Sequence, residues 1–168
     1  IEAAADAVLI GAGSLRATPG LHYAPHLKRI VLTQSGDVFY HEGKLRRFFS
    51  DAPELAFVAC PDSIGLIGPI RPIIKTLPAD PSDLLKSLRQ DHNVKRLVIE
   101  GGSEINAIFL NANLVDELFL TLAPKIKLGR TTPTYAGGEP LARADVMGFT
   151  VVYCEQIADE VFLRYRRA

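Results

Sequence analysis

Short apolar runs, each closed by glycine, proline or a polar turn, recur along the first half of the chain. Residues 7–11 (AVLIG), 29–33 (RIVLT) and 55–60 (LAFVAC) are interpreted as buried strands. A further short strand is expected at residues 73–77. Such uniformly apolar strands are typical of a parallel sheet that is covered on both faces.

Helical spacing of apolar residues begins after residue 80. Leucines recur at that spacing in residues 81–90 (PSDLLKSLRQ), and the opening Pro-Ser-Asp provides capping chemistry. A strand follows at residues 95–100 (KRLVIE), and a second amphipathic helix is expected from Ser103, a candidate N-cap. Strand and helix therefore alternate, which predicts a mainly parallel sheet flanked by helices.

The last third of the chain has a different pattern. A strand is expected at residues 116–123 (DELFLTLA), followed by a long loop over residues 127–143 that is rich in Gly, Thr and Pro. Two more strands, near residues 149–156 and 160–166, are separated by only three residues, which predicts an antiparallel hairpin. The hairpin would make the sheet mixed, and we predict one α/β domain over residues 1–168.

Composition narrows the class of protein. A chain of 168 residues suits one domain, and its 19 basic residues balance 19 acidic ones, so no nucleic-acid or membrane-surface partner is expected. No apolar run approaches the ~20 residues of a membrane span, and the opening lacks the features of a secretory signal. A cytoplasmic location is the default. Cys60 and Cys154 lie in apolar runs, which predicts buried thiols rather than a disulfide.

Two strand–glycine–helix junctions are candidate phosphate-binding sites. They are residues 11–14 (GAGS) and residues 100–103 (EGGS). Ligands of open α/β sheets bind beyond the carboxyl ends of strands, and glycine lets the backbone approach a pyrophosphate closely. The alternative is that these glycines only make tight turns. Arg16 stands where a GxGxxG fingerprint needs its third glycine, so a Rossmann fold is not supported.

Three segments resemble a known family. VIEGGSEINAIFLNANLVDELFLTLAPKIKLG (98–129) resembles the C-terminal signature of the riboflavin-biosynthesis reductase domain, a dihydrofolate-reductase-like family. ADAVLIGAGSLRATPG (5–20) resembles its first signature, and VFLRYRR (161–167) its last strand. The segments occur in the expected order and cover nearly the whole chain.

The resemblance implies an NADPH-dependent reductase of a phosphoribosylamino-pyrimidine, which converts the ribosyl ring to a ribityl chain by hydride transfer to the sugar C1′. Glu100 matches the carboxylate that contacts the substrate, and its alternative role is a solvated carboxylate or a partner of the helix N-terminus. The positions that match cofactor contacts are Gly11, Gly13, Ser14, Thr18, Thr33, Ser35, Gly101, Gly102, Ser103, Glu104, Ile105 and Asn106.

The chain departs from the family in two places. Thr18 stands where the first signature has an acidic residue, and a threonine supplies hydrogen bonds but no negative charge. The family's N-terminal strand, with its S-L-D-G segment, is absent from this sequence. Two alternatives therefore stay open: a relative that reduces another small substrate, and a non-catalytic nucleotide-binding module.

Other polar residues carry weaker hypotheses. Arg16, Lys28 and Arg29 are candidates for a substrate phosphate, although ordinary exposed charges are expected there. The histidines lack metal-ligand spacing, so no metal is expected. A homodimer is implied by the resemblance and by the apolar composition of the last strands, whose side chains could instead pack on the protein's own helices. The residues concerned are Phe149, Val151, Tyr153, Phe162 and Tyr165.

Overall fold

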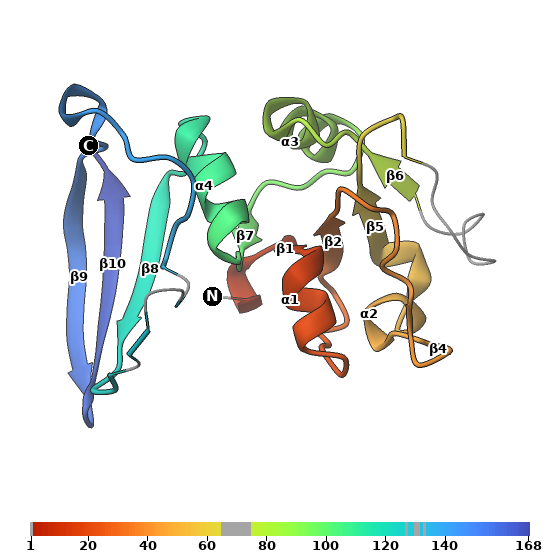
Figure 1. Ribbon diagram of the computed structural model, residues 1–168, viewed down its shortest axis with the longest axis horizontal. Helices are drawn as coiled ribbons and strands as arrows, with labels where there is room; N and C mark the ends of the chain where they lie inside the picture. The colour runs from red at the N-terminus through yellow and green to blue at the C-terminus, as the bar shows by residue number, and fades with distance from the viewer. Residues whose placement is uncertain (1, 65–74, 127, 130–131, 133) are drawn as a thin grey trace.

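A five-stranded parallel sheet forms the centre of the N-terminal two thirds of the chain (Figure 1). The computed structural model describes residues 2–64, 75–126, 128–129, 132 and 134–168. The sheet has the order β6-β5-β2-β1-β7. Its strands are β1 (Ala7–Gly11), β2 (Lys28–Leu32), β5 (Ala56–Ala59), β6 (Lys75–Leu77) and β7 (Leu97–Ile99). Four lie within predicted strands, and β2 begins one residue before its predicted range of 29–33. Residues 73 and 74 of the fourth prediction are outside the described residues.

Both faces of this sheet are covered, as the uniformly apolar runs predicted. Along β1, Val8 and Ile10 face the short helices α1 (Ala12–Ala17) and α2 (Arg47–Ser50). Ala7 and Leu9 face the opposite side, with α3 (Pro81–Gln90) and α4 (Ser103–Asn111). Burying a side chain of this size stabilises the fold by roughly 1.5–3 kcal/mol. The central strands are therefore fixed from both sides.

Two helix starts differ in detail from the sequence prediction. Helix α3 is capped by Asp80, whose carboxylate accepts hydrogen bonds from the N–H groups of Ser82 and Asp83 at 2.9 and 3.0 Å. Capping thus comes from the residue before the Pro-Ser-Asp that was expected to provide it. In α4, Gly102 is the N-cap and Ser103 is the first helical residue.

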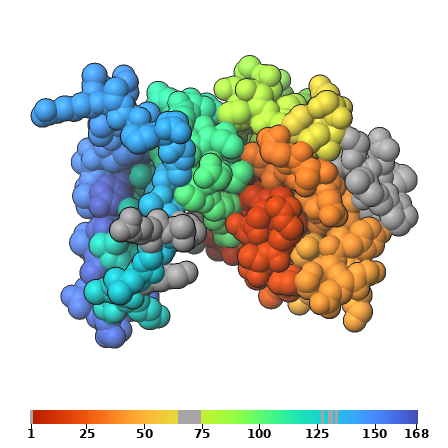
Figure 2. Space-filling model, in the orientation of Figure 1, coloured from red at the N-terminus to blue at the C-terminus, as the bar shows by residue number. Residues whose placement is uncertain are grey.

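The C-terminal strands form a separate antiparallel sheet at one end of the molecule (Figures 1 and 2). It consists of β8 (Glu117–Leu122), β9 (Phe149–Ile157) and β10 (Glu160–Arg167), in the order β8-β10-β9. The predicted hairpin is confirmed, but it pairs with β8 and not with the parallel sheet. Cys154 lies on β9, whose residues after Phe149 are all exposed, so the prediction that it is buried was wrong, whereas Cys60 is buried.

Several short elements between the main strands were not predicted. They are the hairpin of β3 (Tyr40–His41) and β4 (Lys44–Leu45), α2, and the 3-10 turns at Glu2–Ala4, Pro53–Leu55 and Arg143–Asp145. Helix α1, in contrast, follows the first glycine junction, where a helix was expected. Arg29 also differs from the expected exposed charge, because it is only 1% exposed and donates to the carbonyl of Ala52 at 2.6 Å. Its burial removes it as a candidate for binding a substrate phosphate.

Candidate cofactor and substrate site

The two glycine junctions, far apart in the sequence, meet at one edge of the parallel sheet. Strands β1 and β7 are parallel neighbours, so their carboxyl ends lie side by side. The N–H of Gly11 donates to the carbonyl of Gly101 at 2.8 Å. A Cβ atom built on Gly102 would lie 3.8 Å from Ser14 Oγ, so the Ser14 hydroxyl faces the second junction. The structure therefore joins both predicted phosphate-binding segments into one site.

Helix α4 presents an uncapped N-terminus to this site. Its N-cap is Gly102, which has no side chain to accept the free N–H groups of the first turn. Those N–H groups and the positive end of the helix dipole favour an anion. Gly102 is exposed, and the space next to its Cα is open apart from Ser14 Oγ. These features fit the phosphate groups of a dinucleotide.

Gly101 makes the turn that brings β7 into α4. Its φ angle of +81° lies in the left-handed region that side chains with a Cβ rarely adopt. A Cβ there would also lie 3.2 Å from the side-chain amide of Asn106. Glycine is therefore required at this position by conformation and by space.

The side chains of the first turn of α4 contact a loop from the C-terminal third of the chain. Asn106 Nδ2 donates to the carbonyl of Tyr135 at 2.7 Å, and the N–H of Gly137 donates to the carbonyl of Ser103 at 3.0 Å. A Cβ on Gly137 would lie 2.6 Å from Glu104 Oε1, so the loop packs directly on this turn. Ile105, also among the predicted cofactor contacts, is buried in the core. The groups that this turn offers to a ligand are therefore mainly its backbone amides.

Three other predicted cofactor contacts lie outside the two glycine junctions. Thr33 and Ser35 follow β2, the neighbour of β1, so they lie at the same sheet edge. Thr33 Oγ1 accepts the N–H of Ser35 at 3.2 Å, and Ser35 itself is exposed. Thr18 is the exposed C-cap of α1, at the opposite end of that helix from Gly11.

Glu100 is exposed directly after β7, at the same edge as the glycine junctions. Its Oε2 accepts a hydrogen bond of 2.7 Å from the hydroxyl of Tyr23. Tyr23 is only 8% exposed, and its ring packs edge-on against Phe48. Burial and the Glu100 carboxylate together raise the pKa of Tyr23 well above its usual value, so the phenol stays protonated. Sequence reasoning missed Tyr23, because a single tyrosine in a polar connection carries no recognisable signal.

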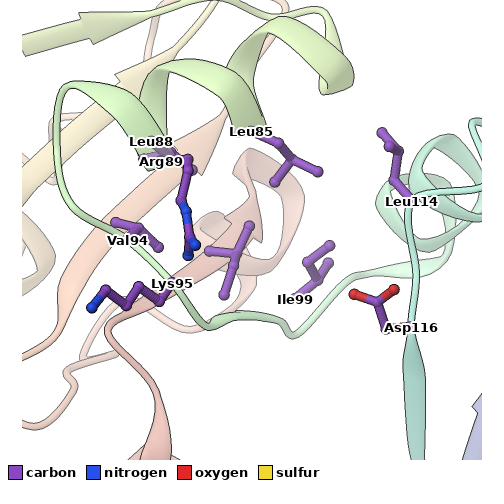
Figure 3. A pocket seen from close by; sticks show the side chains of 9 residues that line it. Leu85, Leu88, Arg89, Val94, Lys95, Ile99, Leu114 and Asp116 are labelled. Atoms are coloured by element: carbon purple, nitrogen blue, oxygen red, sulfur yellow. The ribbon is translucent and has the colours of Figure 1, made fainter.

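One hollow of the described surface lies away from these residues. It is a cavity of about 220 Å³ between α3, β7 and the segment that leads into β8 (Figure 3). Six apolar side chains line it together with three charged residues, Arg89, Lys95 and Asp116. None of the predicted site residues lines it. We therefore assign the candidate site from the strand ends and not from this cavity.

Comparison with known families shows which family the chain belongs to. The family model of the RibD C-terminal domain matches residues 1–163. The chain belongs to the RibD C-terminal domain family. The resemblance drawn from the two glycine-containing signatures is therefore confirmed. Among the described residues, no group of three or more His, Cys, Asp or Glu could hold a metal ion, and no helix has the length and apolarity needed to cross a membrane.

Solved structures agree with this membership at the level of the fold. RibD of Acinetobacter baumannii superposes with a TM-score of 0.80 at 21% identity, over 99% of this chain and 48% of that one. A Thermotoga maritima diaminohydroxyphosphoribosylaminopyrimidine deaminase/5-amino-6-(5-phosphoribosylamino)uracil reductase gives 0.73 at 21%, over 99% and 46%. Dihydrofolate reductase from Enterococcus faecalis, solved with NADP(H), gives 0.50 at 17%, over 96% and 73%. The RibD C-terminal domain described here thus has the predicted dihydrofolate-reductase-like fold, and spans about half the length of the first two proteins.

Proposed function

We propose that this RibD C-terminal domain is an NADPH-dependent reductase of riboflavin biosynthesis. Its substrate is 5-amino-6-(5-phosphoribosylamino)uracil, whose ribosyl group it reduces to ribityl. The observation that carries the proposal is the convergence of both glycine junctions and Glu100 at the carboxyl ends of β1 and β7, in a chain of this family. We regard residues 1–168 as one reductase domain.

The backbone of the second junction is the proposed holder of the cofactor phosphates. Gly102 allows close approach, and the first-turn amides of α4 donate to phosphate oxygens. Ser14 adds a hydroxyl from the first junction, and Thr33 and Ser35 extend the site along the sheet edge. When bound, NADPH supplies the hydride that reduces the sugar C1′. The choice of NADPH over NADH rests on the family resemblance.

Glu100 is the proposed substrate contact. Its exposed carboxylate lies at the strand end next to the glycine turn. If the substrate reacts as its ring-opened, protonated imine, positive charge is shared between the nitrogen and C1′ until the hydride neutralises it, and a fixed anion stabilises this iminium. The same carboxylate can accept a hydrogen bond from a ribose hydroxyl. The protein then mainly orients the reactants and stabilises charge, and needs little further acid–base machinery.

Consumption of NADPH in the presence of 5-amino-6-(5-phosphoribosylamino)uracil tests the proposal. We expect turnover by the wild-type protein and a loss of roughly 100-fold in kcat/KM for Glu100→Gln, which keeps the shape and removes the charge. Glu54→Gln, at the exposed 3-10 turn Pro53–Leu55, is the matched control and should behave as wild type. Absence of turnover with this substrate would contradict the proposal.

Two alternative functions give different results in the same assay. A relative that reduces another small substrate is favoured by Thr18, which brings no negative charge to the first signature. It would bind NADPH and turn over only with a different carbonyl or imine compound. A non-catalytic nucleotide-binding module would bind NADPH without turnover of any substrate tested.

We also propose that the protein is a homodimer, through the C-terminal sheet. Large apolar side chains are half-exposed there, including Phe119 at 46%, Leu122 at 55% and Val151 at 51%. A second copy is a common way to cover such a surface. Light scattering at micromolar concentration tests this, since a mass near 18.3 kDa would exclude the dimer. The cytoplasmic location expected from the sequence stays a prediction.

A further inference from the structure

We propose that Tyr23 is a positioning residue of the reductase site, which holds the Glu100 carboxylate in place for the substrate. The inference rests on the proposed function. It starts from the 2.7 Å hydrogen bond that the Tyr23 hydroxyl donates to Glu100 Oε2 across 77 positions of sequence. No motif used to predict the site includes Tyr23.

The ring of Tyr23 is fixed by the core. The residue is 8% exposed and belongs to the cluster that packs under α1 and α2. Its ring stands at 81° to that of Phe48, with 6.2 Å between the ring centroids. An edge-on aromatic contact of this kind restricts the ring to one orientation. The hydroxyl therefore points from a rigid base toward the sheet edge.

Glu100, in contrast, is an exposed side chain with several rotatable bonds. A free glutamate of this kind loses conformational entropy whenever a ligand orders it. The bond from Tyr23 orders one carboxylate oxygen in advance, and a hydrogen bond to a carboxylate is stronger than a neutral one. Among the described residues, no other side chain or N–H group donates to Glu100, so Oε1 is left for the substrate.

The hydroxyl can act only as a donor in this pair. Because burial and the neighbouring carboxylate raise the pKa of Tyr23, the phenol is protonated at neutral pH. Tyr23 thus gives Glu100 a hydrogen-bond donor, which orients the carboxylate.

The test compares Tyr23→Phe, which removes only the hydroxyl, with Tyr40→Phe. Tyr40 packs against the same core cluster and makes no side-chain hydrogen bond among the described residues. We expect kcat to fall roughly tenfold in Tyr23→Phe, with an unchanged NADPH dissociation constant. Unfolding should stay cooperative, although the loss of a hydrogen bond to a carboxylate lowers the stability of the variant. Tyr40→Phe should match wild type. In the Glu100→Gln background, Tyr23→Phe should cause no further loss, because its effect passes through Glu100.

Turnover and NMR measurements separate a failure of the positioning role from a failure of the proposed function. Wild-type turnover with an unaffected Tyr23→Phe variant, or an additive loss in the double variant, overturns the positioning role alone. A wild-type protein without turnover overturns the proposed function and this role with it. The contact itself is read from ¹³C-tyrosine NMR: Glu100→Gln should shift the Cζ resonance of Tyr23 and leave those of the other tyrosines in place. No shift would show that the hydrogen bond is absent in solution.

Discussion

The two glycine junctions look alike in the sequence, but they have different surroundings. At the first, a Cβ on Gly11 would lie 2.8 Å from Cγ1 of Ile105, inside normal contact distance. At the second, a Cβ on Gly102 would meet nothing closer than Ser14 Oγ at 3.8 Å. Gly11 is therefore closed by protein, and Gly102 is open to a ligand.

This difference indicates that the first junction packs against the second and holds it in place. Because Gly11 has no Cβ, the start of α1 lies close to α4. The N–H of Gly11 donates to the carbonyl of Gly101, which precedes α4. Helix α1 has six residues, which is too few for a strong dipole, whereas α4 has nine and an uncapped start. We therefore propose a packing role for Gly11 and phosphate binding at the turn of Gly102.

Gly11→Ala should give the largest change in stability. Its Cβ would press against the buried Ile105 side chain, and overpacking of this kind costs about 1–3 kcal/mol. Gly13→Ala is the matched control, because its Cβ would meet nothing within 4 Å and it lies inside α1. Removing a helical glycine should stabilise the protein by about 0.5–1 kcal/mol. Urea unfolding measures both, and equal stability of the two variants would refute the contrast.

Gly101→Ala should have the next largest effect. The φ angle of +81° costs a residue with a Cβ about 1–2 kcal/mol, and the Asn106 amide stands 3.2 Å from the new atom. The same unfolding experiment measures the loss. Stability equal to wild type would mean that the turn relaxes, and that glycine is not needed there.

Asn106→Ala should have the smallest effect on global stability, about 1 kcal/mol, because its hydrogen bond to Tyr135 is exposed. Its local effect is specific: the amide of Gly137, which donates to Ser103, should exchange its hydrogen faster as the loop loosens. Asn111→Ala is the control on the same helix, since Asn111 has no hydrogen bond to the loop among the described residues. Unchanged exchange at Gly137 in Asn106→Ala would separate the loop from the first turn of α4.

Local patterns explain why much of the fold could be predicted. Strands β1, β2 and β5 are apolar runs ended by glycine, a turn or proline, and those signals act within a few residues. The strand–turn–helix unit around Gly101 was predicted for the same reason, and the structure confirms it. The hairpin of β9 and β10 follows from its short connection.

Features that depend on distant neighbours could not be predicted. Cys154 is exposed in spite of its apolar run, and Arg29 is buried in spite of its charge. Whether a glycine is closed or open depends on Ile105 and Ser14, which belong to the opposite junctions. The Tyr23–Glu100 bond joins residues 77 positions apart, and no sequence spacing encodes it. Local pattern thus located the candidate site, while its geometry needed the fold.

Titration of NADPH into the wild-type and Gly102→Val proteins tests the central assignment most directly. At φ −74° and ψ −156° the backbone of Gly102 accepts a side chain, and only Ser14 Oγ lies near it, so the variant should fold. Gly20→Val, at an exposed glycine with nothing within 4 Å of its Cβ, is the matched control. We predict that Gly102→Val weakens NADPH binding by at least about tenfold, or about 1.4 kcal/mol, while Gly20→Val binds as wild type. Unchanged NADPH affinity in a folded Gly102→Val protein would contradict the account.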